Sequence, residues 1–429
     1  MSTLTPTSRK SLPGADDITR VQLSNGITIL TRPNFNSPSV VISGYLPVGS
    51  LFDPDEKLGR AHFTSLALLN GTSRRNFQQI YDTLESAGAL LGFSSGVHTT
   101  GFNARALAED LPMLLELMVE ALTTPTFPTE QAERLRAQFL TSLAIRAQET
   151  GEMASLTFDQ ILYAGHPYSR PEDGFVETVQ AIRIEDLAAF HKLHYGPRGM
   201  VVVVVGAVEP EQVIEQVNRA LGDWKNPAQP VPPDLPQLQP VTATLRKHVP
   251  IPGKSQTDLV MGCSGPCRRS PDFVAASLGN NILGQFGMYG RIGDVVRERS
   301  GMAYYAYASL NSGTGPGSWE VAAGINPANL DKTIDLVKTE ISRFIREPVA
   351  KDELSDSQAN YIGRLPLSLE SNNGMASALL NLERFELGLD YYRSYASMVR
   401  SVTPEQILSV AQCYLDPQRM VISSAGPAL

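Results

Sequence analysis

The sequence predicts an α+β protein built from two duplicated domains, each a mostly antiparallel sheet with helices packed on one face. Three observations support this fold class: similar segments recur about 220 residues apart, strand-like runs alternate with long helical blocks, and a proline-rich stretch separates the two copies. With 429 residues and 42% hydrophobic content, the chain is too long for a single core and apolar enough for two.

The duplication is clearest toward the end of each half. Four pairs of identical residues lie 220 positions apart: Glu185 and Glu405, Pro197 and Pro417, Met200 and Met420, and Gly206 and Gly426. An apolar stripe at helical spacing over residues 107–122 returns over residues 330–341, each time after a strand-like run. The chain is therefore two copies of one unit of roughly 200 residues.

Each copy predicts the order strand, strand, helix, strand, two or three helices, and a final strand. In the first copy we expect strands over 27–30, 40–45, 100–106 and 200–205, and helices over 76–85 and 184–193. Long helical blocks separate the strands, and the apolar residues mostly alternate. This pattern favours an antiparallel or mixed sheet over a doubly wound parallel one.

A proline-rich segment separates the copies. Residues 226–240 contain six prolines, a density that sustains neither helix nor sheet and makes a stiff, extended linker. We therefore predict an N-terminal domain over residues 1–225, a linker over 226–241, and a C-terminal domain over 242–429.

Composition excludes several classes of function. The net charge of −8 argues against a nucleic-acid-binding protein, and the longest aliphatic run, Met200 to Val205, is too short to span a membrane. The first residues lack a basic end followed by an apolar core, so we expect no signal peptide and a cytoplasmic protein. The three cysteines (263, 267 and 413) are too few for a disulfide framework or a zinc knuckle, and we expect plain thiols.

The most informative motif surrounds His62. A zinc protease that carries its ligands on one helix needs a second histidine one turn after the first, with a carboxylate between them as general base. Here Ser65 stands where the acid would be, and Leu66 stands where the second histidine would be. The plain alternative is that His62 is a helix residue kept for packing or by chance.

The order of the motifs resembles the pitrilysin/insulinase family of zinc peptidases, in particular the smaller two-domain members that include mitochondrial processing peptidase. The resemblance runs from about Val21 to Gly426. It rests on the duplication, the linker and four short motifs: Leu-Ser-Asn-Gly-Ile at 23–27, Gly-Arg-Ala-His-Phe at 59–63, Asn-Gly-Thr at 70–72 and Gly-His-Pro-Tyr at 165–168. It implies clam-like chains that pair to enclose a chamber.

The resemblance also identifies what is missing. Active members carry His-x-x-Glu-His and a later glutamate; the matching positions here are His62, Ser65, Leu66 and, at or near it, Ser142. One ligand of three remains and the base is absent, so we expect no catalytic residue and no bound metal in this chain alone.

A second family feature is present. The family's second domain carries an arginine and a tyrosine, seven residues apart, that hold the substrate backbone; Arg297 and Tyr304 have that spacing. A guanidinium and a phenol can donate hydrogen bonds to a substrate carbonyl. The alternative is a salt-bridged arginine and a core tyrosine.

Three other features receive plainer interpretations. Residues 87–95 correspond to the family's edge strand, where an extended peptide can pair, although here it can be a relic. The glycines at 279–293 lack a following Gly-Lys-Ser/Thr, so we expect a tightly turned or flexible segment rather than a nucleotide site. We expect His191 and His194 to be surface residues at a helix end, and His166 to be a turn residue.

In the two-subunit relatives, one chain supplies the zinc motif and its partner supplies the Arg/Tyr pair. The main hypothesis is therefore a non-catalytic subunit that pairs with a zinc-bearing homologue and acts on peptides or unfolded proteins, with zinc in the partner. A purely structural assembly subunit is the alternative from another class. An autonomous zinc peptidase with unusual ligands is a third.

Overall fold

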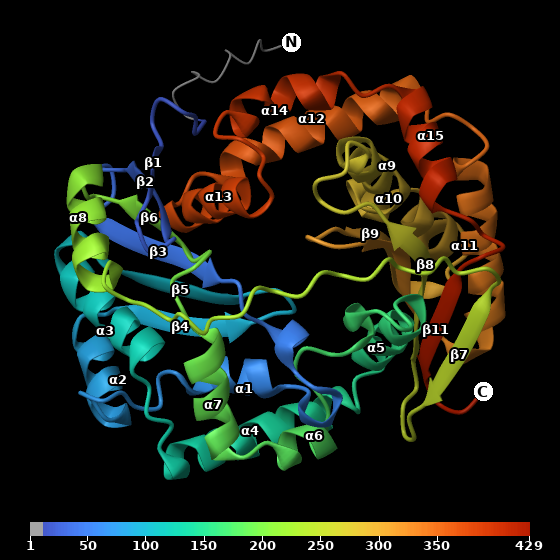
Figure 1. Ribbon diagram of the computed structural model, residues 1–429. Coiled ribbons are helices and arrows are strands. Elements are labelled where there is room, and N and C mark those ends of the chain that lie inside the picture. The colour runs from blue at the N-terminus through green and yellow to red at the C-terminus, as the bar shows by residue number, and fades with distance from the viewer. Residues whose placement is uncertain (1–11) are drawn as a thin grey trace. The chain divides into compact units, whose positions relative to one another are not determined.

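The computed structural model describes residues 12–429, apart from the side chains of residues 286–289. It divides into two compact units (Figure 1). Unit 1 contains the described residues up to Leu143, together with Pro171–Asp234 and Pro366–Arg393; unit 2 contains Ala144–Arg170, Leu235–Leu365 and Ser394–Leu429. Each unit holds one sheet, as the duplication predicts.

The sheet of unit 1 has six strands in the order β1-β2-β6-β3-β5-β4. Neighbours are antiparallel except β2 and β6, which are parallel. The strands are β1 Thr19–Gln22, β2 Thr28–Pro33, β3 Ser39–Leu46, β4 Leu90–Ser95, β5 Thr100–Leu107 and β6 Val201–Gly206.

The helices of the first half begin with α1, the helix that carries His62. They are α1 Arg60–Ala67, α2 Phe77–Ser86, α3 Leu111–Thr123, α4 Thr129–Arg146, α5 Thr150–Leu162, α6 Val176–Ala181, α7 Ile184–His194 and α8 Pro210–Leu221. Short 3-10 turns cover Ser50–Phe52, Asp55–Lys57, Ala108–Asp110 and Pro167–Ser169. The core of unit 1 lies between the sheet and helices such as α1 and α3, where Ile42, Phe63 and Leu114 are fully buried.

The sheet of unit 2 has five strands in the order β7-β11-β8-β10-β9. The strands are β7 Leu245–Pro250, β8 Thr257–Gly265, β9 Ala303–Asn311, β10 Gly317–Ile325 and β11 Val421–Gly426. The helices of the second half are α9 Phe273–Gly284, α10 Phe286–Gly293, α11 Leu330–Phe344, α12 Lys351–Ser368, α13 Asn372–Arg384, α14 Tyr391–Arg400 and α15 Pro404–Tyr414, with a π-helical segment at Asp294–Arg299 and a 3-10 turn at Pro327–Asn329.

The structure confirms the duplication. The order β2-β6-β3-β5-β4 in unit 1 matches β7-β11-β8-β10-β9 in unit 2, including the single parallel pair. Strands β6 and β11 begin 220 residues apart (421 − 201), as do helices α7 and α15 (404 − 184). The predicted α+β class with mostly antiparallel sheets is confirmed.

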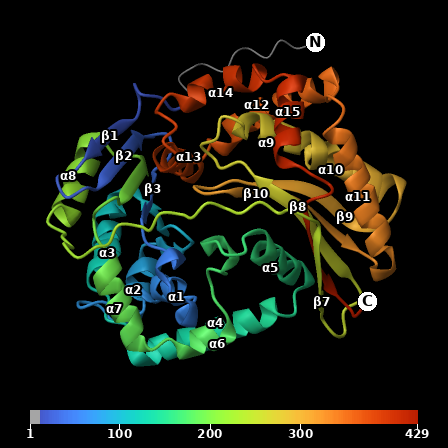
Figure 2. The ribbon, with the colours of Figure 1, turned by 45° about the vertical axis from the view of Figure 1, so that its right-hand side comes forward.

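One helix in each half belongs to the unit formed mainly by the other half. Helix α5 packs on β8, β11 and β7 of unit 2, and α13 packs on β3 and β6 of unit 1. The first residues of the two helices are 222 positions apart (372 − 150), so the helices occupy equivalent places in the repeat. Figures 1 and 2 show each helix beside its sheet.

The sequence predicted helices on one face of each sheet. In the structure, α5 and α13 also cover the opposite face. In unit 2, Leu259 and Met261 of β8 face the main core, whereas Val260 between them packs with α5. Strand β6, a run of five valines, is buried along its whole length. A continuous apolar strand needs a cover on both faces, and α13 supplies the second one.

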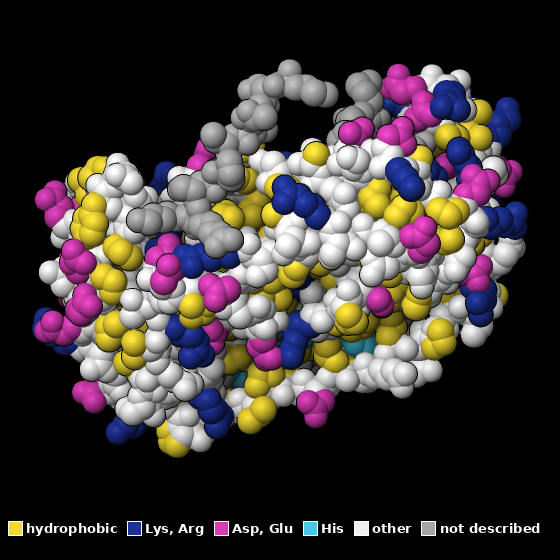
Figure 3. Space-filling model, turned by 90° about the horizontal axis from the view of Figure 1, so that it is seen from above, with side chains coloured by type: hydrophobic (Ala, Val, Ile, Leu, Met, Phe, Trp, Pro, Cys, Tyr) yellow, Lys and Arg dark blue, Asp and Glu magenta, His cyan; other side chains and the backbone are white. Residues whose placement is uncertain are grey.

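The proline-rich segment between the two copies, which is described throughout, carries no regular secondary structure. No helix or strand lies between Leu221 and Leu245 in the described chain. Its first part is fixed to unit 1 by Gln229, which is buried: the Gln229 side chain accepts from Arg198 N (3.1 Å) and donates to Arg198 O (3.0 Å). None of the helices described is long and apolar enough to cross a membrane. On the face shown in Figure 3, acidic and basic side chains are interspersed and form no large basic patch.

Candidate functional site

Helix α1 begins at a tightly built turn. Gly59 has a left-handed conformation (φ +91°), and a Cβ there would lie 2.7 Å from the carbonyl oxygen of Asp173, so only glycine fits. The buried carboxylate of Asp53 accepts from Ala61 N at 3.1 and 3.2 Å, which satisfies a free amide at the start of the helix. The Gly-x-Ala-His frame is therefore fixed at its first turn.

A charged and aromatic cluster supports the same turn. Arg60 lies 3.6 Å from Asp53 Oδ1, and its guanidinium lies 4.7 Å from the ring centre of Phe190. The ring of His194 packs at a tilt against the rings of Phe52 and Phe190, with ring centres 4.5 Å apart in each case. Burial raises the pKa of Asp53 to about 7, and burial together with the nearby Arg60 lowers the pKa of His194 to about 4. Sequence reasoning did not single out Asp53 or Arg60.

His62 sits on the exposed side of this frame and is half-buried. Its Nδ1 lies 3.4 Å from the carbonyl oxygen of Ser95, and its ring centre lies 5.2 Å from that of Phe139. Ser65 is 1% exposed, and its hydroxyl donates to His62 O at 2.8 Å. These contacts are local packing and helix hydrogen bonds.

The other two positions of the expected zinc motif offer no ligand. Leu66 is a half-buried aliphatic residue, and Ser142 is exposed, its hydroxyl donating to Gln138 O of its own helix at 3.2 Å. Of the four matching positions, His62 alone carries a side chain of the kind that binds zinc in proteins. Among the described residues, no group of three or more His, Cys, Asp or Glu could hold a metal ion. The residues present do not fit zinc.

Strand β4 lies at the edge of its sheet, as predicted for this segment. It pairs with β5 alone in the sheet order, and its last residue, Ser95, is the one whose carbonyl oxygen lies beside His62. An edge strand has a free row of backbone donors and acceptors, so an extended peptide can pair with it.

Arg297 and Tyr304 lie on successive elements of unit 2. Arg297 belongs to the π-helical segment, and Tyr304 is the second residue of β9, the edge strand of this sheet. The Tyr304 side chain is 69% exposed, so the alternative of a core tyrosine is wrong. Arg297 is 35% exposed and lies 3.6 Å from the carboxylate of its neighbour Glu298, an ion pair that its exposure keeps weak.

The glycines before this pair permit close backbone packing. A Cβ at Gly284 would collide with the backbone of Ala308 in β9, and Gly290 has a left-handed conformation (φ +64°) in which a Cβ would lie 2.6 Å from Ile282 O. We expected a tightly turned or flexible segment here, but the glycines lie in the two consecutive helices α9 and α10, with Gln285 alone between them.

The histidines at the end of α7 differ from expectation. We expected surface residues, but His194 is 9% exposed, and His191 is half-buried with its Nε2 2.9 Å from Leu122 O. Both have lowered pKa values because burial disfavours the charged ring. The helix end packs against aromatic side chains, which a sequence window does not reveal. His166, as predicted, is a turn residue; its Nδ1 accepts from Tyr168 N at 3.1 Å.

The two sheets share one strand order, and helix α1 carries His62 without further metal ligands among the described residues. These features are those of a duplicated, peptidase-like protein. Residues 28–171 match the family model described as insulinase (peptidase family M16), and residues 181–361 match the one described as the peptidase M16 inactive domain. The chain belongs to the M16 peptidase family.

Similar proteins cover almost the whole chain. An uncharacterized zinc protease from Streptomyces coelicolor is 26% identical over 432 residues, which is 99% of this chain and 92% of that protein. A solved structure of a peptidase M16 inactive domain from Pseudomonas fluorescens has a TM-score of 0.87 at 26% identity and covers 96% of this chain and 98% of its own. A protease from Helicobacter pylori has a TM-score of 0.88 at 19% identity, which shows the shared fold.

Proposed function

We propose that this chain is the non-catalytic subunit of a heterodimeric zinc metallopeptidase. In this proposal it pairs with a zinc-bearing homologue in the cytoplasm and contributes substrate-binding and chamber residues to the hydrolysis of peptides or unfolded proteins. Three of the four positions that match the family's zinc site in unit 1 carry serine or leucine, while unit 2 has Arg297 in the π-helical segment and an exposed Tyr304 in the edge strand β9. That combination is the observation that carries the proposal.

The roles of this chain's residues follow from their chemistry. The phenol of Tyr304 and the guanidinium of Arg297 donate hydrogen bonds to a peptide carbonyl and stabilise the negative charge that develops on its oxygen. Backbone groups of the edge strand β9 hold the peptide in an extended conformation. Zinc in the partner would supply the activated water. The similarity to a structure named as an inactive domain supports a chain without its own metal.

The test is cleavage by the reconstituted pair. We expect the substitutions Arg297→Ala and Tyr304→Phe each to lower kcat by about 100-fold, because each removes a donor to the developing oxyanion. Assembly, followed by gel filtration, should be unchanged. Arg299→Ala is the matched control, because Arg299 is a 73% exposed arginine of the same π-helical segment.

Two outcomes would refute the proposal. If both variants support cleavage like the wild type, the purely structural role is favoured instead. If the chain purifies from its source alone, without a companion that carries His-x-x-Glu-His, the heterodimer is refuted.

A further inference from the structure

Arg291 is the cation of a buried cluster in unit 2. It lies in α10, six residues before Arg297, and its side chain is 13% exposed. Its Nε and Nη2 donate to the two carboxylate oxygens of Glu353 at 2.9 and 2.6 Å, a paired geometry that only arginine can make. Glu353 stands near the start of α12, where its carboxylate also accepts from Ala350 N at 2.9 Å.

A third helix joins through Glu340. This carboxylate lies on α11, is 6% exposed, and lies 3.6 Å from Arg291 Nη1. The Arg291 guanidinium also lies 5.6 Å from the ring centre of Phe344, one turn further along α11. Arg291 therefore ties α10 to both α11 and α12. Removing it would leave two partly buried carboxylates without their main counter-charge.

Helix α10 continues directly into the π-helical segment Asp294–Arg299. The π-helix is rare, and it is found frequently at functional sites. Ile292 and Val296 are fully buried and hold one side of the segment, and the Arg291 cluster precedes it by three residues. The position of Arg297 depends on how firmly this backbone is held, because Arg297 is part of the π-helical segment.

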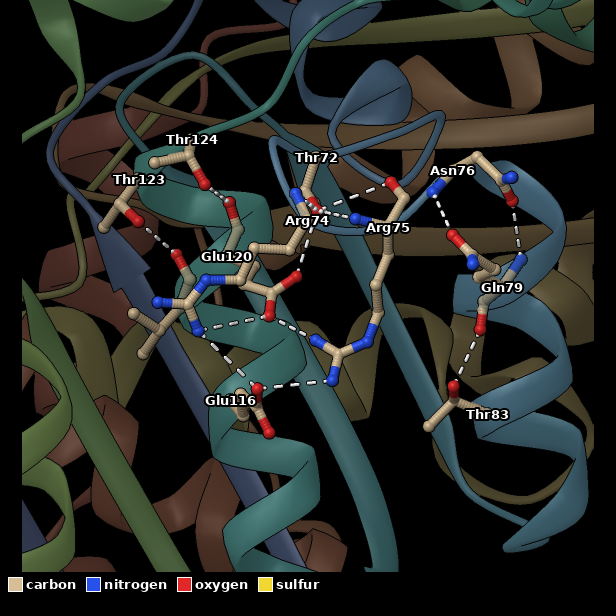
Figure 4. Close-up of polar contacts among 11 residues, drawn as sticks. Thr72, Arg74, Arg75, Asn76, Gln79, Thr83, Glu116, Glu120, Thr123 and Thr124 are labelled. Carbon is tan, nitrogen blue, oxygen red and sulfur yellow. Dashed lines mark hydrogen bonds and ion pairs between the residues drawn. The ribbon is translucent and has the colours of Figure 1, made fainter.

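Unit 1 contains a similar ion pair (Figure 4). Glu120 of α3 lies 220 residues before Glu340 of α11, and it is also buried. Its carboxylate is paired with Arg75, which also contacts Glu116 at 3.2 Å. Thr72 donates to Glu120 at 3.0 Å. This pair fixes the turn before α2, a segment without an Arg297 equivalent.

We propose that Arg291 is a positioning residue: by clamping α10 to α11 and α12, it fixes the π-helical turn in the conformation that presents Arg297 to the substrate. The inference rests on the function proposed above for Arg297. A partly buried Arg–Glu pair occurs in each unit, and in unit 2 it holds the segment that contains Arg297.

The substitutions Arg291→Lys and Glu353→Gln test the inference, with Arg75→Lys as the matched control. Lysine keeps the charge but cannot form the paired contact with Glu353. We expect amide hydrogen exchange over residues 294–302 to accelerate about tenfold or more in Arg291→Lys and Glu353→Gln, as local opening becomes easier. Arg75→Lys should accelerate exchange over 72–76 and leave 294–302 unchanged.

Cleavage by the reconstituted pair gives the second readout. Arg291→Lys and Glu353→Gln should reduce kcat/KM in the same direction as Arg297→Ala, and Arg75→Lys should leave it at the wild-type value. Unchanged exchange over 294–302 in both unit 2 variants overturns the positioning role, as does an equal loss of kcat/KM in Arg75→Lys.

The two proposals fail separately. If Arg297→Ala and Tyr304→Phe both leave cleavage intact while Arg291→Lys loosens residues 294–302, the proposed function is refuted and the structural clamp is supported. If Arg297→Ala abolishes cleavage and Arg291→Lys changes neither exchange nor cleavage, the clamp is refuted and the proposed function is supported.

Discussion

At the scale of single residues, the described part of unit 1 keeps the contacts that hold helix α1 in place but lacks the side chains that would bind zinc. The glycine turn, the Asp53 cap and the buried Phe63 that hold α1 are all in place. Ser65 and Leu66 lie in the same helix, where a base and a ligand would be needed. A catalytic zinc site needs three protein ligands, and the packing of α1 is maintained here without them.

The absence of a second and a third ligand beside His62 among the described residues predicts that the isolated chain does not bind zinc with useful affinity. After incubation with excess zinc and gel filtration, metal analysis should find far less than one equivalent, because a lone imidazole holds zinc weakly. His62→Ala should leave that content unchanged. A homologue with His-x-x-Glu-His serves as the positive control. A stoichiometric zinc content in this chain would contradict the prediction and favour an autonomous peptidase.

The buried His194 predicts a pH dependence of stability. Its pKa is about 4 in the folded protein and ordinarily 6.5, so below pH 6.5 the unfolded chain binds a proton that the folded one excludes. The stabilisation is complete above pH 6.5 and is lost as the pH falls toward 4. Asp53 in the same cluster acts oppositely: its raised pKa favours the folded state as the pH falls from 7 toward 4.

The His194 contribution can be isolated by comparison with His194→Asn, which does not titrate in this range. Between pH 7 and 5 the wild type should lose about 1–2 kcal/mol more unfolding free energy than the variant, measured by urea denaturation. Asp53 is common to both proteins, so its contribution cancels to first order. Equal pH slopes would show that the pKa of His194 is the same in the folded and unfolded states, which would contradict the prediction.

At the scale of elements, local periodicity predicted several helices and strands. The strands expected over 40–45 and 100–106 are β3 and β5, and the helix expected over 184–193 is α7. The edge position of β4 followed from the family resemblance and is confirmed. The π-helical segment was not predicted, because residues 294–299 have an ordinary helical composition and nothing in their local spacing marks the wider turn.

At the scale of the whole molecule, the sequence halves and the compact units are different divisions of the chain. Helix α5 of the first half lies on the unit 2 sheet, and α13 of the second half lies on the unit 1 sheet. Each half therefore lacks a helix that its own sheet needs. The boundary predicted at the linker separates the two copies in the sequence. Whether each copy folds by itself can be tested.

We expect a chain cut within residues 231–234 to remain a single species in gel filtration. These residues are exposed and lie beyond the Gln229 anchor, so a protease site there should be cleaved readily. The fragments should stay together because α13 covers the apolar face of β6, and they should separate only in denaturant. The fragment 1–225 made alone should be unstable for the same reason. Two separate, stably folded halves would contradict this prediction.

The sequence by itself determined the duplication, the alternation of strands and helices, and the absence of a His-x-x-Glu-His motif at residues 62–66, because these depend on residue identity and local spacing. It also identified Arg297 and Tyr304 through the resemblance. Only the tertiary structure decided which sheet each of α5 and α13 covers, that His194 is buried, and that Arg291 joins three helices. An apolar stripe or a charged residue encodes the need for a partner, whereas the identity of that partner depends on contacts between residues far apart in the chain.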